Sequence, residues 1–253
     1  MNTKFSLLRK EMVEAQIRKR GITEEKILNI FSALPREDFL PSELKETAYS
    51  DKPESIGFGQ TISQPYMTAL MTCVLGPKKG EKILELGTGS GYQTAVLAGL
   101  GVHVYTIEKI PELSLQAFLR LKKLGYKVKL EPHSVFERDS FDKESQRKNN
   151  IFSDAEIDIN PACINIKTGD GTLGWEKNSP FSGIIVTAGS FKVPEPVLKQ
   201  LSQGGRIVIP LGGRFSQNLV KITKMNDSEF KKEKICECMF VPLLGKYAWN
   251  DDA

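Results

Sequence analysis

Glu85–Tyr92 has the sequence E-L-G-T-G-S-G-Y and joins an apolar stretch, Lys82–Leu84, to a helical pattern, Gln93–Leu100. A strand, a glycine turn and a helix in this order form a nucleotide-binding corner. Glycines let the backbone approach a ligand closely, and the helix N-terminus offers unpaired N–H groups. A dinucleotide fingerprint, G-x-G-x-x-G, would need its third glycine at position 92, where this chain has Tyr92. The turn therefore argues against NAD as the ligand.

The pattern at this turn is instead E-x-G-x-G-x-G, with an acid two residues before the first glycine. It favours S-adenosylmethionine, whose amino-acid end is a zwitterion rather than a pyrophosphate. Backbone amides and small residues can receive the carboxylate of this zwitterion, and a nearby acid favours its ammonium group. A structural turn without a ligand is the alternative. The candidate cofactor-binding residues of the turn are Glu85, Gly87, Thr88, Gly89, Ser90 and Gly91.

Two further acids follow predicted strands. Glu108 comes directly after Val102–Ile107, at a spacing from the glycine turn that suits a carboxylate accepting hydrogen bonds from ribose hydroxyls. Asp170 and Gly171 come after Cys163–Thr168, and an Asp at the carboxyl end of a parallel strand can accept from an amine such as adenine N6. The alternatives are an ordinary surface acid for the first and an ordinary D-G turn for the second.

From Lys82 onward, predicted strands alternate with helices. This alternation predicts an α/β fold with a Rossmann-like, doubly wound, mostly parallel sheet and helices on both faces. A helix is expected at Pro194–Leu201, closed by Gly204-Gly205. The two predicted strands nearest the C-terminus, Leu219–Lys224 and Lys234–Val241, are expected to form an antiparallel hairpin at the edge of the sheet. The predicted strands are Lys82–Leu86, Val102–Ile107, Cys163–Thr168, Gly183–Thr187, Arg206–Pro210, Leu219–Lys224 and Lys234–Val241.

The chain is expected to form a single domain over residues 1–253. Residues 1–80 would form an N-terminal cap of helices and loops, and residues 81–253 would form the Rossmann-like core. A polar, irregular insertion at about 131–161 interrupts the core and is interpreted as a surface excursion between a helix and a strand.

Composition excludes several classes of function. The chain has 253 residues with a net charge of +4, and the charge is spread out rather than clustered as in a nucleic-acid footprint. No apolar stretch is long enough to span a bilayer, and the N-terminus is too polar for a signal peptide. Four cysteines without C-x-x-C spacing and two histidines predict no metal site. We expect a cytoplasmic monomer with reduced thiols that binds neither nucleic acid nor membranes.

A further candidate site, Gly57–Tyr66, overlaps the start of a helix predicted between Pro65 and Leu75. It contains Ser63, but neither histidine lies near enough in sequence to activate this hydroxyl, and a G-x-S-x-G elbow is missing. These absences argue against a serine hydrolase. The residues alone leave Ser63 either as a helix N-cap or as part of a ligand site.

The segment Gly59–Pro65, G-Q-T-I-S-Q-P, resembles the signature of the protein-L-isoaspartate (D-aspartate) O-methyltransferases. The resemblance runs from about residue 9 to 249, apart from the insertion. It does not rest on the glycine turn, because many class I methyltransferases share that turn. The chain departs from the family at Ser182, where an Asp is usual. Further similar segments are Met12–Ile22, Pro35–Pro41, Ala48–Asp51, Gly169–Trp175, Ile184–Ala188, Gly204–Arg206 and Phe240–Gly245.

This resemblance implies that S-adenosylmethionine donates a methyl group to the α-carboxylate of L-isoaspartyl residues in damaged proteins and peptides. S-adenosylhomocysteine is left, and the methyl ester collapses to a succinimide without the enzyme. A carboxylate is already ionised at neutral pH, so positioning rather than a strong base should supply the catalysis. The resemblance implies that Ser63 is the active-site hydroxyl, also in contact with the cofactor, and that Thr61 and Ile62 line the cofactor pocket beside it.

Two other functions remain as alternatives to isoaspartyl repair. One is a class I methyltransferase that uses a different carboxylate acceptor. The other is a protein that binds the cofactor without turnover, although the intact glycine turn and both strand-end acids argue against such a loss.

Overall fold

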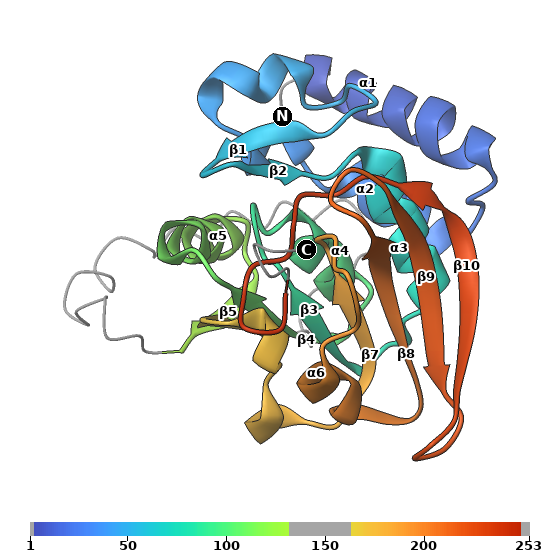
Figure 1. Ribbon diagram of the computed structural model, residues 1–253. Helices are drawn as coiled ribbons and strands as arrows, with labels where there is room; N and C mark the ends of the chain where they lie inside the picture. Colours follow the sequence, from blue (N-terminus) through green and yellow to red (C-terminus); the bar gives the residue numbers. More distant parts are fainter. Residues whose placement is uncertain (1–2, 132–162, 249–253) are drawn as a thin grey trace.

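The computed structural model describes residues 3–131 and 163–248 (Figure 1). Its main sheet has eight strands in the order β10-β9-β8-β7-β3-β4-β6-β5. The strands from β5 to β8 run parallel, and β9 and β10 add an antiparallel edge. The sheet confirms the predicted fold class. The strands are β3 (Lys82–Leu86), β4 (His103–Glu108), β5 (Lys127–Leu130), β6 (Cys163–Thr168), β7 (Phe181–Val186), β8 (Leu201–Gly212), β9 (Gln217–Lys224) and β10 (Phe230–Cys238).

The central strands are buried on both faces, which explains their nearly continuous apolar sequences. Successive residues of β7 point to opposite faces, so Ile184 and Ile185 belong to two different hydrophobic clusters. One cluster packs under α4 (Tyr92–Gly99) and α5 (Pro111–Lys123), and the other packs under the short helix α6 (Glu195–Lys199). The helices therefore cover both faces of the sheet.

Strand order reverses beside β3, because the chain continues to β4 on one side and β7 fills the other side. The carboxyl ends of parallel strands diverge at such a switch point and leave a crevice where ligands bind. The glycine turn follows β3 directly and leads into α4. The topology thus places this turn at the position where an α/β sheet binds its ligand.

The N-terminal part forms a layer of helices and a small antiparallel β1–β2 hairpin, drawn in blue across the top of the sheet in Figure 1. Buried side chains of this layer, such as Ile27 and Phe31, share a hydrophobic cluster with Ile83 and Val104 of the sheet. The elements are α1 (Thr3–Met12), the π-helical turn η1 (Val13–Ile17), the 3₁₀ turns η2 (Arg18–Arg20), η3 (Arg36–Phe39) and η4 (Ser42–Thr47), α2 (Glu25–Ala33), β1 (Glu54–Gly57), β2 (Gln60–Ile62) and α3 (Pro65–Leu75).

The structure corrects the helix expected at Pro194–Leu201. The helix α6 ends at Lys199, because the N–H of Phe181 already pairs with the carbonyl of Gln200 and strand β8 begins at Leu201. Gly204-Gly205 lies inside β8 instead of closing a helix. A Cβ on Gly205 would lie 2.7 Å from the carbonyl oxygen of Ser202, so a glycine is needed at this irregular point of the strand.

Other boundaries differ less. The final hairpin begins at Gln217, and its second strand runs from Phe230 to Cys238, earlier than expected. The short strands β1, β2 and β5 were not predicted. The insertion predicted at 131–161 lies outside the described residues apart from Glu131.

Candidate active site

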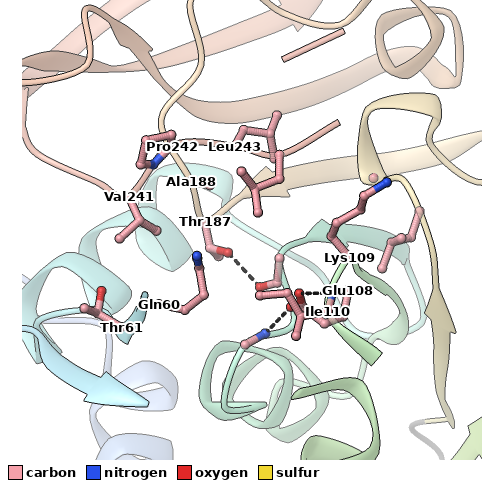
Figure 2. Close-up of a pocket in the computed structure, with 15 residues that line it drawn as sticks. Gln60, Thr61, Glu108, Lys109, Ile110, Thr187, Ala188, Val241, Pro242 and Leu243 are labelled. Atoms are coloured by element: carbon pink, nitrogen blue, oxygen red, sulfur yellow. Dashed lines mark hydrogen bonds between the residues drawn. The ribbon is translucent and has the colours of Figure 1, made fainter. Parts of the chain in front are cut away.

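Two adjoining cavities lie at the carboxyl ends of β3, β4 and β7. The larger spans about 550 Å³ and is bounded by the strand ends, Gly171 and the C-terminal segment 241–244 (Figure 2). The smaller spans about 320 Å³ between the glycine turn and the Ser63 loop, residues 59–64. Both have the size of a site for a small molecule or one part of it. They share Thr61, Gly87, Gly89 and Thr187, so the two cavities form one two-part site.

The glycine turn needs its glycines for two reasons. Gly87, Gly89 and Gly91 all have left-handed backbones, with φ of 93°, 52° and 87°. In addition, a Cβ on Gly87 would lie 2.6 Å from Oγ1 of Thr187. Figure 2 shows Thr187 at the end of β7 with its hydroxyl directed at this turn, where Oγ1 lies 2.7 Å from the carbonyl oxygen of Gly87. The turn is therefore held close to β7.

Glu108 borders the larger cavity with a carboxylate that is already fixed in place. One oxygen accepts from the N–H of Gly89 over 2.8 Å and the other from the N–H of Ile110 over 3.0 Å (Figure 2). Burial raises the pKa of Glu108, and these N–H donors counteract part of that effect. Each carboxylate oxygen keeps a further lone pair, so the group can accept two hydroxyls of a ligand.

Glu85 lies away from the two cavities. Its side chain is fully buried, and neither cavity is lined by it. Alternation along β3 directs it beneath α4, where it accepts from Oγ1 of Thr94 over 2.5 Å. Burial raises the pKa of Glu85 to about 8, which favours its neutral form. Glu85 thus packs beneath α4, and its contact with the cofactor's ammonium group stays a prediction.

Asp170 makes hydrogen bonds within the protein that the sequence did not predict. It caps the 3₁₀ turn η6 (Gly171–Leu173), accepting from the N–H and hydroxyl of Thr172 over 2.9 and 2.6 Å. Its other oxygen accepts from the N–H of Lys246 over 2.8 Å. Burial opposes ionisation, but these hydrogen bonds outweigh it and lower the pKa of Asp170. Asp170 thus fastens the C-terminal segment, while Gly171 beside it borders the larger cavity.

Ser63 does not cap the helix that follows it. The N-cap of α3 is Gln64, and no side chain makes a capping hydrogen bond there. Among the described residues the Ser63 side chain makes no hydrogen bond, and Ser63 lines the smaller cavity together with Thr61 and Ile62. The loop is fixed by its neighbours, since the Gln64 amide donates to Asp51 Oδ1 over 2.8 Å. Ser63 therefore lines the smaller cavity without serving as the helix cap.

The structure gathers most of the predicted site residues. Among them Glu85, Gly91 and Asp170 do not line either cavity. Sequence reasoning missed Thr187, although its place at the end of a predicted strand could have indicated it. No local signal marks Val241–Leu244 as part of the same site. The predicted residues that line a cavity are Thr61, Ile62, Ser63, Gly87, Thr88, Gly89, Ser90, Glu108 and Gly171.

The described residues hold no cluster of three or more His, Cys, Asp or Glu side chains that could bind a metal ion. Within residues 3–131 and 163–248, no helix has the length and apolar character needed to cross a membrane. All four cysteines are free thiols.

Comparison with known proteins agrees with this geometry. Residues 8–248 match the family model of protein-L-isoaspartate(D-aspartate) O-methyltransferase. A protein-L-isoaspartate O-methyltransferase of Geobacter metallireducens is 42% identical over 98% of this chain and 99% of its own length. One of Dictyoglomus turgidum is 44% identical, with 98% and 96% covered.

A solved Plasmodium falciparum structure, assigned to the same kind of enzyme and in complex with S-adenosyl-L-homocysteine, has a TM-score of 0.69. It covers 94% of this chain and 99% of its own at 23% identity, a likeness that shows the fold. With the match to the family model and the two bacterial relatives, the conclusion is direct: this chain belongs to the protein-L-isoaspartate (D-aspartate) O-methyltransferase family.

Proposed function

We propose that this chain is a protein-repair methyltransferase that moves a methyl group from S-adenosylmethionine to the α-carboxylate of L-isoaspartyl residues in damaged proteins. The observation that supports it most is that Ser63 lines the same cavity as the glycine turn, in a member of this family. The donor's pocket and an acceptor-facing hydroxyl then belong to one two-part site.

The residues present fit the cofactor. The larger cavity offers the fixed carboxylate of Glu108 and the apolar side chains of Ile110 and Leu243, which suit a ribose and a flat base. The smaller cavity offers Thr88 and Ser90 with the backbone of the glycine turn, which suits a zwitterionic end. When bound, the cofactor supplies a sulfonium methyl group as the electrophile.

The chain's own contribution is to hold groups in position. An acceptor carboxylate is ionised at neutral pH, so no side chain has to remove a proton from it. The Ser63 hydroxyl can donate to one carboxylate oxygen and thereby direct the other toward the donor's pocket. Thr187 keeps the turn at Gly87 in one place. Such alignment of reacting groups can supply a large part of the rate acceleration of a transfer reaction.

Isoaspartyl-containing proteins and peptides are the proposed substrates. We infer a single methyltransferase domain over residues 1–253 that works as a cytoplasmic monomer without nucleic acid. The mild, dispersed charge supports the lack of a nucleic-acid partner, and the four free cysteines suit a reducing compartment.

The chemistry of the product tests the proposal. An isoaspartyl peptide incubated with enzyme and S-adenosylmethionine should give a methyl ester that converts to a succinimide, and then to a mixture containing the normal aspartyl peptide. Mass spectrometry with chromatographic separation follows each species. An ester that persists without forming a succinimide would indicate a different carboxylate acceptor and would reject the repair function.

A further inference from the structure

Four side chains beneath the site form a continuous stack of guanidinium groups and aromatic rings. The guanidinium carbon of Arg36 lies 4.9 Å from the ring centroid of Tyr92. The rings of Tyr92 and Phe39 meet edge to face, with centroids 5.2 Å apart. The guanidinium carbon of Arg120 lies 5.9 Å from the ring centroid of Phe39. All three contacts fall within the distances at which cation–π and aromatic pairs attract.

Each end of this stack holds one half of the two-part site. Arg36 Nη2 donates to the carbonyl oxygen of Ser63 over 2.7 Å. Arg120 Nη1 donates to the carbonyl oxygen of Ser90, also over 2.7 Å. Ser63 and Ser90 both line the smaller cavity, one from the Ser63 loop and one from the glycine turn. The stack therefore connects the two segments between which a methyl group would pass.

Stability alone gives little reason for arginines at these places. Arg36 has no exposed surface, and Phe39 and Tyr92 are almost equally buried. Removing a guanidinium from water costs free energy that an apolar side chain of similar volume would not cost. What a guanidinium adds is a rigid, planar set of donors that fixes the position of the carbonyl it binds. Arg36 uses a second donor, Nε, on the carbonyl of Ala48 over 2.7 Å, so its own position is fixed as well.

We propose that Arg36, Tyr92, Phe39 and Arg120 are positioning residues that set the place of the Ser63 loop relative to the glycine turn, so that acceptor and methyl donor meet in line. This inference rests on the proposed function of the site. In-line transfer is sensitive to small displacements, and a misplacement of about 1 Å can cost on the order of 100-fold in rate. Shortening either arginine should therefore affect turnover more than cofactor affinity.

The first test compares Arg36→Lys and Arg120→Lys with a matched control, Arg206→Lys. Arg206 is also a largely buried arginine that donates to main-chain carbonyls, those of Leu75 and Gly76, but it borders neither cavity. We expect kcat on an isoaspartyl peptide to fall about tenfold or more in the first two variants, with the Kd for S-adenosylhomocysteine changed less than about threefold. The control should lose thermal stability and keep its kcat.

The double variant sharpens the test. If both arginines act through one stack, breaking either end disturbs the same alignment, and the combined loss of kcat should be smaller than the product of the single losses. Arg120 is only partly buried, so its variant keeps the test available if Arg36→Lys does not fold. A loss of kcat that follows melting temperature in all variants, the Arg206 control included, would overturn the inference.

A second measurement needs no acceptor. Amide hydrogen exchange in Arg36→Lys should rise both at residues 59–64 and at residues 87–92, because the stack joins these segments. A rise confined to 59–64 would overturn the positioning role. A wild-type enzyme that fails to methylate isoaspartyl peptides would reject the proposed function instead, and the exchange pattern would still decide whether the stack couples the two segments.

Discussion

The hydroxyl of Thr187, at the end of β7, donates to the carbonyl oxygen of Gly87 over 2.7 Å. The same hydroxyl oxygen would lie 2.6 Å from a Cβ added at Gly87. The neighbouring strand thus fixes the glycine turn and also forbids any side chain at its first glycine. This contact lies where the two cavities join, so the shape of the whole site depends on it.

Gly87→Ala should weaken cofactor binding by about tenfold or more, because the new Cβ must displace Thr187 and distort the turn. Isothermal titration with S-adenosylhomocysteine measures this loss. Gly80→Ala is the matched control: Gly80 has a similar φ of 84° with open space around it. Backbone strain should cost each variant about 1–2 kcal/mol of stability. Gly87→Ala should lose more than this because of the contact with Thr187, and only Gly87→Ala should lose affinity.

Glu108→Ala should raise the cofactor Kd about 10- to 100-fold, since it removes a charged acceptor and leaves the N–H groups of Gly89 and Ile110 without their partner. Glu112→Ala, an exposed acid in the first turn of α5, provides the control. Equal affinities in the two variants would remove Glu108 from the ribose-binding role.

Ser63→Ala should lower kcat on an isoaspartyl peptide about tenfold or more, because it removes the hydroxyl that directs the acceptor. The melting temperature should change by no more than about 2 °C, since Ser63 makes no capping hydrogen bond. Steady-state kinetics and thermal unfolding measure the two effects. Wild-type turnover in this variant would show that the Ser63 hydroxyl does not direct the acceptor.

Glu85 should make stability fall as pH rises. Burial raises its pKa from an ordinary 4.5 to about 8, so between these values the folded protein holds a proton that the unfolded chain has lost. The stabilising contribution of neutral Glu85 is complete below the unfolded pKa and is lost as pH rises through the folded pKa.

Glu85→Gln removes this dependence while keeping an acceptor for Thr94. Urea unfolding at pH 5 and pH 8 should show a difference in stability that is smaller in Glu85→Gln than in the wild type by about 1 kcal/mol or more. Glu108, whose pKa burial also raises, stays in both proteins and cancels in the comparison. An unchanged difference would place the Glu85 carboxyl in contact with water.

Local sequence patterns predicted the central strands and the glycine turn well. The strands β3 and β6 have the predicted bounds, because apolar runs that end in turn residues mark buried parallel strands. The glycine turn was also evident, since only glycine suits its left-handed backbone. The short strands β1, β2 and β5 were not predicted, because three or four residues show too little hydrophobic periodicity to mark a strand. Their formation depends on the strands with which they pair.

Side-chain placement could not be predicted in the same way. The side chain of Glu85 lies beneath α4, because alternation along β3 decides on which face of the sheet it projects. The sequence alone does not say which face of the sheet borders the cavity. The carboxylate of Asp170 accepts a hydrogen bond from the backbone N–H of Lys246, 76 residues further along the chain. Only folding brings these two residues together. The importance of Ser63 came from resemblance to a family, because the residues around it allowed a helix cap equally well.

Isoaspartyl repair is tested with two peptides that differ only in one linkage, L-isoaspartyl in one and normal L-aspartyl in the other. Each is incubated with the enzyme and S-adenosylmethionine labelled in its methyl group, and base-labile label is counted. We expect label on the isoaspartyl peptide alone, with the Ser63→Ala enzyme about tenfold or more slower. Equal labelling of both peptides, or of neither, would contradict isoaspartyl repair.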